Sequence, residues 1–248
     1  MKKLTVIFIL LSTVALGQKV KIKEIKRDST KWNNAAPYPV VIFPDIKAHS
    51  DEASKKINAL LIASFADTDS WNNDIEAAID SSVNDNLYSL GYEVTYNNNN
   101  ILSIRLNIIC CNAYCSGWSA YYNFNITTGN PITMDDILSG DKKPAFVNKV
   151  LTEKNKYLTD YMSGMEDSLK KGAIDSGAYQ WVSEIVNGGC LNNVTLDQFS
   201  ISATGIEIDE NCYLPHAIQI YQPDYDINYS YASISEFLNP EWKKILMK

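Results

Sequence analysis

The chain has 248 residues, of which 46% are hydrophobic, 11% aromatic and 21% charged, a composition that fits one ordinary globular domain able to bury a sizeable core without depending on disulfides. Its formal net charge of −7 disfavours nucleic acid and anionic membrane as partners, because basic patches supply most of the binding energy to both. The same charge mildly favours a cationic partner, although moderate acidity also simply keeps a protein soluble.

The first 17 residues have the features of a signal peptide. Lys2 and Lys3 form a positive start, residues 4–16 are a nearly unbroken apolar run, and Ala15-Leu16-Gly17 has the spacing of small residues that signal peptidase accepts. The run is shorter than the ~18 to 20 apolar residues of a spanning helix, which favours cleavage over an uncleaved anchor. We therefore expect a secreted or periplasmic chain that begins at Gln18 and has no membrane span. Loss of the two lysines leaves 20 basic against 29 acidic residues, a net charge of −9.

Five cysteines predict disulfides, since thiols in an exported protein are usually oxidised. They are Cys110, Cys111, Cys115, Cys190 and Cys212, and their odd number leaves one free or paired between molecules. Neighbours on a strand face opposite sides of a sheet, so Cys110 and Cys111 should have different fates. We expect the first three cysteines to be tied to the last two. Zinc binding is the alternative because three thiols lie within six residues, but their spacing is not the paired C-x2-C of structural zinc sites.

The first half of the mature chain, residues 37–138, is expected to hold helices followed by strands. Before it, residues 18–36 are charged and weakly patterned and lead to two close prolines, which predicts a flexible lead-in. Apolar residues then recur at helical spacing twice, and Gly91 ends the second helix. The expected elements are a strand at 40–43, a helix capped by Ser50 or Asp51, and a helix from Asp74 to Leu90.

A three-stranded meander follows. Strict alternation of apolar and polar residues at 92–96 and 102–108 predicts two strands with one buried face, joined by a turn of four asparagines, Asn97–Asn100. Residues 122–126 alternate in the same way and predict the third strand. Turn-forming residues at 127–131 end the meander, and Asp135 or Asp136 should begin a short helical turn.

The second half, residues 139–248, is expected to begin with a long helix over 144–171, since Pro144 suits a first helical position. The other expected elements are a short helix near 179–186, strands at 199–203, 206–208, 218–220 and 225–231, and a closing helix over 233–247. Strands in clusters separated by helices predict an α+β fold with a mainly antiparallel sheet, in which the two halves share one compact unit.

This order of elements over residues 37–238 resembles that of a known family. The most specific residues are Tyr122-Asn123-Phe124-Asn125, Thr128-Gly129 and Asp135-Asp136-Ile137-Leu138, with Gly205-Ile206 as weaker support. The chain looks like the paired extracytoplasmic domains of unknown function in RsiV-type lysozyme-sensing anti-sigma factors. The same domains occur as accessory domains of some peptidoglycan deacetylases.

The resemblance implies an isolated sensor or accessory domain. An anti-sigma factor needs a cytoplasmic helical segment, whereas only Met1-Lys2-Lys3 precedes the apolar run, and deacetylase chemistry belongs to a separate metal domain for which the chain has no room. The family often has a Gly-Gly-Ala-His-like corner where this chain has Cys115-Ser116-Gly117-Trp118, so no role of that histidine carries over. Binding of lysozyme or cell-wall material is the function that the resemblance implies.

No catalytic, metal-binding or cofactor motif stands in the sequence, so no catalytic residue, metal or cofactor is predicted. The two histidines, His49 and His216, are outside metal-binding spacings, and a structural role is favoured for His216.

Two pairs of aspartates are candidate acids for glycoside chemistry, which needs two carboxyl groups several ångströms apart across a sugar. Asp135 and Asp136 are adjacent, and helix capping explains them better. Asp224 and Asp226 are two apart on a predicted strand and share a face, so they are the slightly better pair. A solvated strand face remains the favoured explanation for them.

Aromatic residues carry the remaining functional signal. Fifteen tyrosines and five tryptophans exceed what the core obviously requires, and both types are favoured at interfaces. Tyr114, Trp118 and Tyr121 cluster at the cysteine corner on positions that are predicted to face outward or to lie in the loop. They are the predicted ligand-binding residues, with packing under a loop or helix as the alternative.

Two functions from different classes follow. The first is an exported, non-catalytic binding or sensor domain of the cell envelope, whose ligand is a protein, such as lysozyme, or a cell-wall glycan. The second is an envelope hydrolase that acts on peptidoglycan or polysaccharide through carboxylates. A pocket with converging carboxylates and raised pKa values would favour the hydrolase, and an aromatic patch would favour binding.

Overall fold

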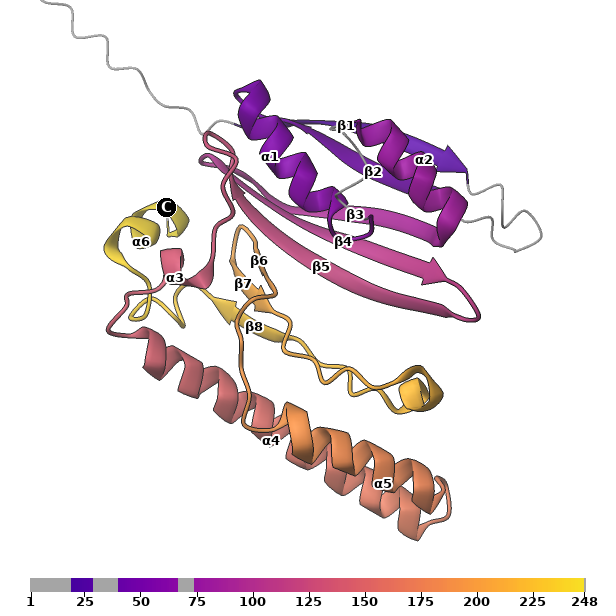
Figure 1. The fold of residues 1–248 in the computed structure, drawn as a ribbon. Coiled ribbons are helices and arrows are strands. Elements are labelled where there is room, and N and C mark those ends of the chain that lie inside the picture. Colours follow the sequence, from indigo (N-terminus) through magenta and orange to yellow (C-terminus); the bar gives the residue numbers. More distant parts are fainter. Residues whose placement is uncertain (1–18, 29–39, 67–73, 248) are drawn as a thin grey trace, which may run out of the picture.

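The computed structural model describes residues 19–28, 40–66 and 74–247 (Figure 1). The predicted signal peptide, residues 1–17, with its cleavage site near Gly17, lies outside the described residues. The described chain forms a five-stranded sheet, a three-stranded sheet and several helices. The α+β fold expected from the sequence is confirmed.

The larger sheet has the strand order β1-β2-β3-β4-β5. Its strands are β1 (Lys21–Asp28), β2 (Val40–Lys47), β3 (Leu87–Asn98), β4 (Ile101–Cys111) and β5 (Cys115–Asn125). Neighbours are antiparallel except for β2 and β3, which run parallel. Strands β3 to β5 confirm the predicted meander. The β3–β4 turn is formed by Asn99 and Asn100, whose φ angles of 50° and 62° are the positive values that a type I′ hairpin turn requires.

Helices α1 (Asp51–Ile62) and α2 (Ile75–Asp85) connect β2 to β3 and cover one face of this sheet (Figure 1). Ser50 caps α1 by accepting a hydrogen bond from the Ala53 N–H, and Asp74 caps α2 in the same way. The apolar stripes of both helices pack on the strands. This core includes Phe43, Ile57, Leu61, Ile79 and Ile104, all fully buried.

The smaller antiparallel sheet lies against the opposite face of β4 and β5 (Figure 1). It consists of β6 (Phe199–Ile201), β7 (Gly205–Ile208) and β8 (Ile227–Ser230). Ser103 of β4 accepts a hydrogen bond from the Ile201 N–H (2.9 Å), and Asn123 of β5 donates one to the Phe199 carbonyl (2.8 Å). Because buried polar groups need partners, these bonds fix the small sheet over the large one.

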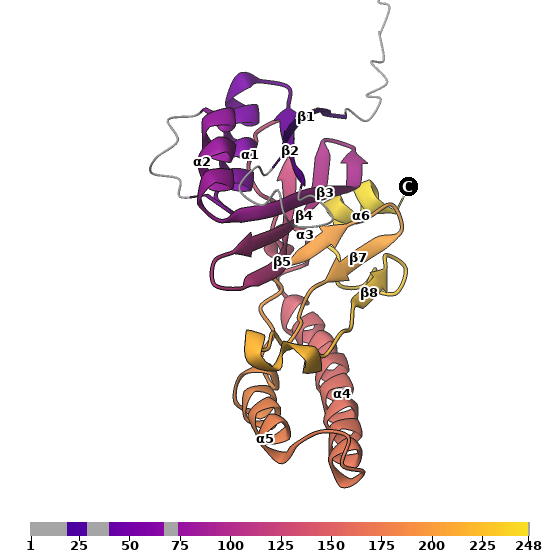
Figure 2. The ribbon, with the colours of Figure 1, turned by 90° about the vertical axis from the view of Figure 1, so that its right-hand side faces the viewer.

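The other helices are α3 (Met134–Ile137), α4 (Lys143–Lys170), α5 (Ser176–Ile185) and α6 (Pro240–Leu246), with a π-helical turn η3 (Val186–Cys190) and a 3-10 segment η4 (His216–Tyr221). Helix α4 confirms the predicted long helix. It forms with α5 an arm that projects from the two sheets (Figure 2). No helix in the described ranges combines the length and the apolar character needed to cross a membrane.

The prediction of a flexible lead-in over residues 18–36 is wrong for Lys21–Asp28, which forms β1 and pairs with β2 along its whole length. Within this strand only Ile25 is buried. The strand is therefore held mainly by backbone pairing, and it lacks the apolar alternation that would have identified it.

Other elements also differ from the prediction. The second helix ends at Asp85 instead of Leu90, because Leu87 and Leu90 pair with β4 as part of β3. Residues 218–220 belong to η4 and not to a strand. The closing helix is only α6, whose first turn is set by Pro240 and by Asn239, which accepts a hydrogen bond from the Trp242 N–H (2.9 Å).

Candidate functional site

Two disulfides anchor the loops at one end of the molecule. Cys111 and Cys115 face each other in the β4–β5 register and close the tip of that hairpin, with a Cα–Cα distance of 4.0 Å. Cys190 at the end of η3 pairs with Cys212, and their Cα atoms are 5.4 Å apart. Cys110 is free.

The expected pairing of the first three cysteines with the last two is therefore wrong, because each pair is made within its own region. The different fates of Cys110 and Cys111 are confirmed. The three neighbouring thiols do not form the alternative zinc site, because Cys111 and Cys115 are joined in a disulfide.

The two anchored loops touch through Tyr114 and His216. Tyr114 lies at the hairpin tip and stacks on the His216 ring at the start of η4, with ring centroids 4.4 Å apart. The loop that carries His216 is closed by Gln222, whose side chain accepts a hydrogen bond from the Leu214 N–H (2.7 Å) and donates one to the Cys212 carbonyl (2.6 Å). A disulfide thus closes each of the two segments, and the side chain of Gln222 also fixes the one that carries His216.

Large apolar side chains are exposed on these same two segments. We call the set Tyr114, Tyr213, His216 and Ile220 the aromatic end. Tyr114, Tyr213 and Ile220 are 61%, 58% and 88% exposed. The Tyr213 hydroxyl donates to Asp209 (2.6 Å), which orients the ring. Such a concentration of exposed apolar area on two fixed loops is typical of an interaction surface.

The structure separates the three predicted ligand-binding residues. Tyr114 belongs to the aromatic end. Trp118 is 38% exposed, and its register partner Ile108 belongs to the core beneath α1 and α2. Tyr121 is three positions farther along β5, so it faces the opposite side of the sheet from Trp118.

Tyr121 is buried, with 9% of its surface exposed, so the outward position expected for it is wrong. Its ring lies 5.9 Å from the Arg105 guanidinium, and its N–H donates to the Gln198 side chain (3.1 Å). These contacts make Tyr121 part of the contact between the two sheets.

Sequence reasoning missed Tyr213, His216 and Ile220. A predicted strand at 218–220 assigned Ile220 to a sheet, although it is among the most exposed apolar residues of the described chain. The one signal in the sequence was the nearby Cys212, since a disulfide can anchor a binding loop. That signal indicates a fixed loop only when its pairing with Cys190 is known.

A hollow of about 410 Å³ lies between β3 and the small sheet and is lined by Glu93 and Glu207. Arg105 connects the two carboxylates, at 2.5 Å from Glu93 and 3.4 Å from Glu207. Burial raises the pKa of the Glu207 carboxyl, the Arg105 charge opposes this rise, and Asp226 and Glu93 add to it. A raised pKa is one property of a general acid.

Asp135 and Asp136, the adjacent candidate acids, have structural contacts. Asp136 forms a capping box with Thr133 at the start of α3, as the capping interpretation predicts, and Asp135 pairs with Lys143. Asp224 and Asp226 precede β8 instead of lying on it, so the shared strand face expected for them is wrong. No group of three or more potential metal ligands gathers among the described residues.

Comparisons with known proteins identify the fold. No protein-family model and no curated protein matches the sequence. A member of the DUF3298 family from Bacteroides fragilis superposes with a TM-score of 0.56 and 15% identity, covering 94% of this chain and 98% of that chain. A DUF3298 family protein from Pseudomonas aeruginosa PAO1 superposes with a TM-score of 0.52 and 8% identity, covering 90% and 95%. The chain therefore has the fold of DUF3298 proteins, and the narrower RsiV-type assignment stays a prediction.

Proposed function

We propose that the chain is an exported, non-catalytic binding domain of the cell envelope, and that the aromatic end holds a protein ligand. The observation that carries this proposal is the stacking of Tyr114 on His216, which joins two disulfide-anchored loops into one exposed surface. Tyrosine side chains supply large contact areas at a low entropy cost. Loops that are already fixed lose little further freedom on binding, which raises affinity.

A cationic protein is the partner that charge favours. The chain without residues 1–17 carries 20 basic and 29 acidic residues, so its net charge of −9 would attract and orient a basic protein. Lysozyme is the basic protein that the resemblance to RsiV-type lysozyme-sensing factors suggests. The disulfides support an oxidising compartment.

The test is a calorimetric titration of the mature chain, residues 18–248, with lysozyme and separately with soluble peptidoglycan fragments. We expect stoichiometric binding of lysozyme that weakens as salt is raised, because screening reduces electrostatic attraction. Tyr114→Ala should weaken binding by about tenfold or more, as expected for a central aromatic contact.

Two control variants make the titration decisive. Leu60→Ala changes an exposed residue of α1 and should leave binding unchanged. Trp118→Ala shows whether the ligand also reaches the other face of the hairpin. Lysozyme binding that Tyr114→Ala and His216→Ala leave unchanged would contradict the aromatic end as the site.

The hydrolase remains a second candidate because of the hollow that holds Glu93 and Glu207, where burial raises the pKa of Glu207. The shared guanidinium of Arg105 gives both carboxylates a structural role as well. A peptidoglycan turnover assay separates the two functions. Cleavage by the wild-type protein that Glu207→Gln abolishes would replace the binding proposal with the enzymatic one.

A further inference from the structure

A polar groove of about 500 Å³ lies at the end of the large sheet opposite the aromatic end. The β3–β4 turn forms one wall and α6 another, whereas the disulfide-closed tip lies at the far end of β4 (Figure 1). Pockets that hold small ligands usually have about 300–1,000 Å³. The groove is therefore large enough for a small ligand or a segment of a chain.

Amide side chains dominate the polar lining. The groups that matter here are Asn99, Asn100, Asn125, Asn130, Glu241 and Trp242. Apolar side chains, among them Ile101 and Ile245, complete the walls. An amide both donates and accepts hydrogen bonds, so several of them around one hollow match a ligand that does the same at many positions.

Backbone contacts hold the walls in place. The Asn100 carbonyl accepts a hydrogen bond from the Ile126 N–H (2.9 Å), and the Asn130 carbonyl accepts one from the Asn125 N–H (2.9 Å). Asn99 donates from its side chain to the Ile245 carbonyl (3.5 Å), which connects the β3–β4 turn to α6. The groove is thus formed before any ligand binds.

Four of the lining side chains make no polar or ring contact with the rest of the described chain. Within the described ranges, no hydrogen bond, ion pair or ring contact engages the Asn100 amide, the Asn130 amide, the Glu241 carboxylate or the Trp242 indole. By contrast, Asn125 accepts hydrogen bonds from the N–H groups of Thr127 and Thr128. Among the described residues, the groove therefore offers two amides and one carboxylate without hydrogen-bond partners, together with an indole ring that has no aromatic partner.

We propose that this groove binds a neutral pyranoside chain. Sugar hydroxyls both donate and accept, which suits the free amides and the Glu241 carboxylate, and the apolar face of a pyranose suits the Trp242 ring. The carboxylates of Asp136 and Glu241 repel an anionic sugar. The same chemistry is found in an N-acetylated wall glycan and in a plain glucan. This inference is independent of the aromatic end.

The experiment titrates the mature chain with three tetrasaccharides. Calorimetry measures the heat of binding, and tryptophan fluorescence is recorded in parallel. Chitotetraose carries acetamido groups, cellotetraose does not, and tetragalacturonate is anionic. We expect saturable binding of at least one neutral tetrasaccharide with a change in fluorescence, and no binding of tetragalacturonate. The neutral sugar that binds more tightly identifies the source as wall glycan or glucan.

The critical variant is Asn100→Gly. It removes the amide, yet glycine adopts the φ of 62° without strain, so the turn is retained. Loss of one or two hydrogen bonds should weaken sugar binding by about tenfold. Trp242→Phe should reduce both the affinity and the fluorescence change. Because Trp242 also packs on the core, Asn100→Gly keeps the test valid if that second variant is unstable.

Tyr114→Ala is the matched control. It should leave sugar binding unchanged, so a failure of the groove and a failure of the aromatic end are distinguishable. The proposal is overturned if neither neutral tetrasaccharide binds, if Asn100→Gly binds as tightly as the wild type, or if tetragalacturonate binds equally well.

Discussion

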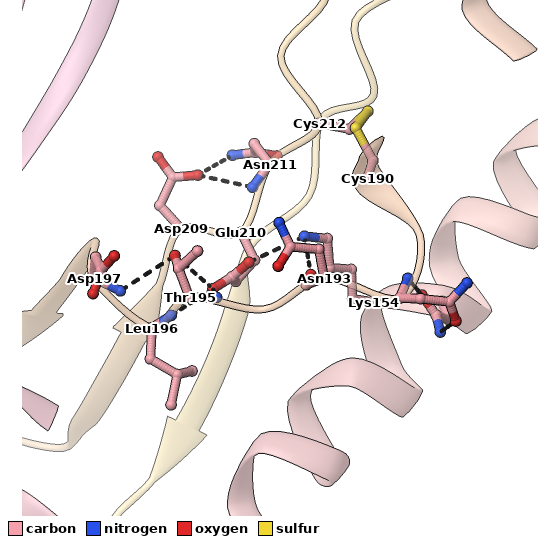
Figure 3. A network of polar contacts seen from close by, with 12 residues as sticks. Lys154, Cys190, Asn193, Thr195, Leu196, Asp197, Asp209, Glu210, Asn211 and Cys212 are labelled. Carbon is pink, nitrogen blue, oxygen red and sulfur yellow. Dashed lines mark hydrogen bonds and ion pairs between the residues drawn. A yellow bond between two sulfur atoms is a disulfide. The ribbon is translucent and has the colours of Figure 1, made fainter. Parts of the chain in front are cut away.

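Lys154 and Glu210 form a buried ion pair, with 3.0 Å between Nζ and Oε2 and only 5% of each side chain exposed (Figure 3). Lys154 also donates to the Asn193 carbonyl (2.8 Å), and Glu210 accepts from the N–H groups of Thr195 and Leu196 (2.8 Å each). The pair therefore connects α4 to the segments on either side of the hairpin β6–β7. It holds the helical arm to the small sheet.

Lys154→Met should destabilise the protein by about 3–5 kcal/mol, because it leaves the Glu210 charge buried without a partner. Urea denaturation of a chain of residues 18–248 measures this change in the free energy of unfolding. Lys156→Met is the matched control on the same helix. Its ion pair with Asp160 is exposed, so we expect a change below about 1 kcal/mol.

The double variant Lys154→Met/Glu210→Gln should be less destabilised than the sum of the two single variants, since no unpaired charge remains. Equal losses for Lys154→Met and Lys156→Met would contradict a structural role of the buried pair.

Sequence patterns predicted the elements in which local periodicity and tertiary environment agree. The alternation at 92–96 and 102–108 predicted β3 and β4, and the asparagine turn between them was expected from its composition. Helix α4 is expected from Pro144, and its buried residues Phe146, Val150 and Leu158 follow at helical spacing. In each case the buried face is encoded in a run of adjacent residues.

The features that sequence missed depend on partners far away in the chain. Strand β1 has little apolar alternation and is held by pairing with β2. Leu87 and Leu90 fit a helical stripe but pair with β4. The contact of Tyr114 with His216 joins residues about a hundred positions apart, and no local pattern encodes such a contact.

The stability of the wild type relative to Glu207→Gln should fall as the pH rises. Burial raises the pKa of the native Glu207 carboxyl above its ordinary value of 4.5, so the folded state binds the proton more tightly than the unfolded state. The resulting stabilisation is complete below pH 4.5 and is lost as the pH rises through the native pKa. Urea denaturation of both proteins at several pH values between about 4 and 7 measures the difference in their free energies of unfolding. A difference that is constant, or that grows in favour of the wild type with pH, contradicts this environment.

One thiol per chain should react with a thiol reagent after denaturation without reductant, and Cys110→Ser should abolish the reaction. In the native protein, burial and then the Asp85 charge raise the pKa of Cys110, which keeps it in the unreactive thiol form. Alkylation of Cys110 at about pH 8 should therefore be slower in the native than in the denatured protein. Three reactive thiols would show that a disulfide is absent.

Gly129 and Gly172 give a matched pair for measuring how tightly the loop after β5 packs on α1. Both have positive φ, 74° and 68°, so alanine at either site brings the same backbone strain, about 1–2 kcal/mol. At Gly172 a Cβ meets nothing within 4 Å, whereas at Gly129 it would lie 2.7 Å from the Ala53 carbonyl oxygen. Gly129→Ala should therefore destabilise the protein more than Gly172→Ala, as measured by urea denaturation.

Gly129 also lies next to Asn130, which lines the polar groove. The Gly129→Ala variant should shift this loop and so weaken sugar binding, whereas Gly172→Ala should leave sugar binding unchanged. Equal stability losses for the two glycine variants would mean that the loop yields freely, and the groove would then lack the fixed wall on which the sugar site depends.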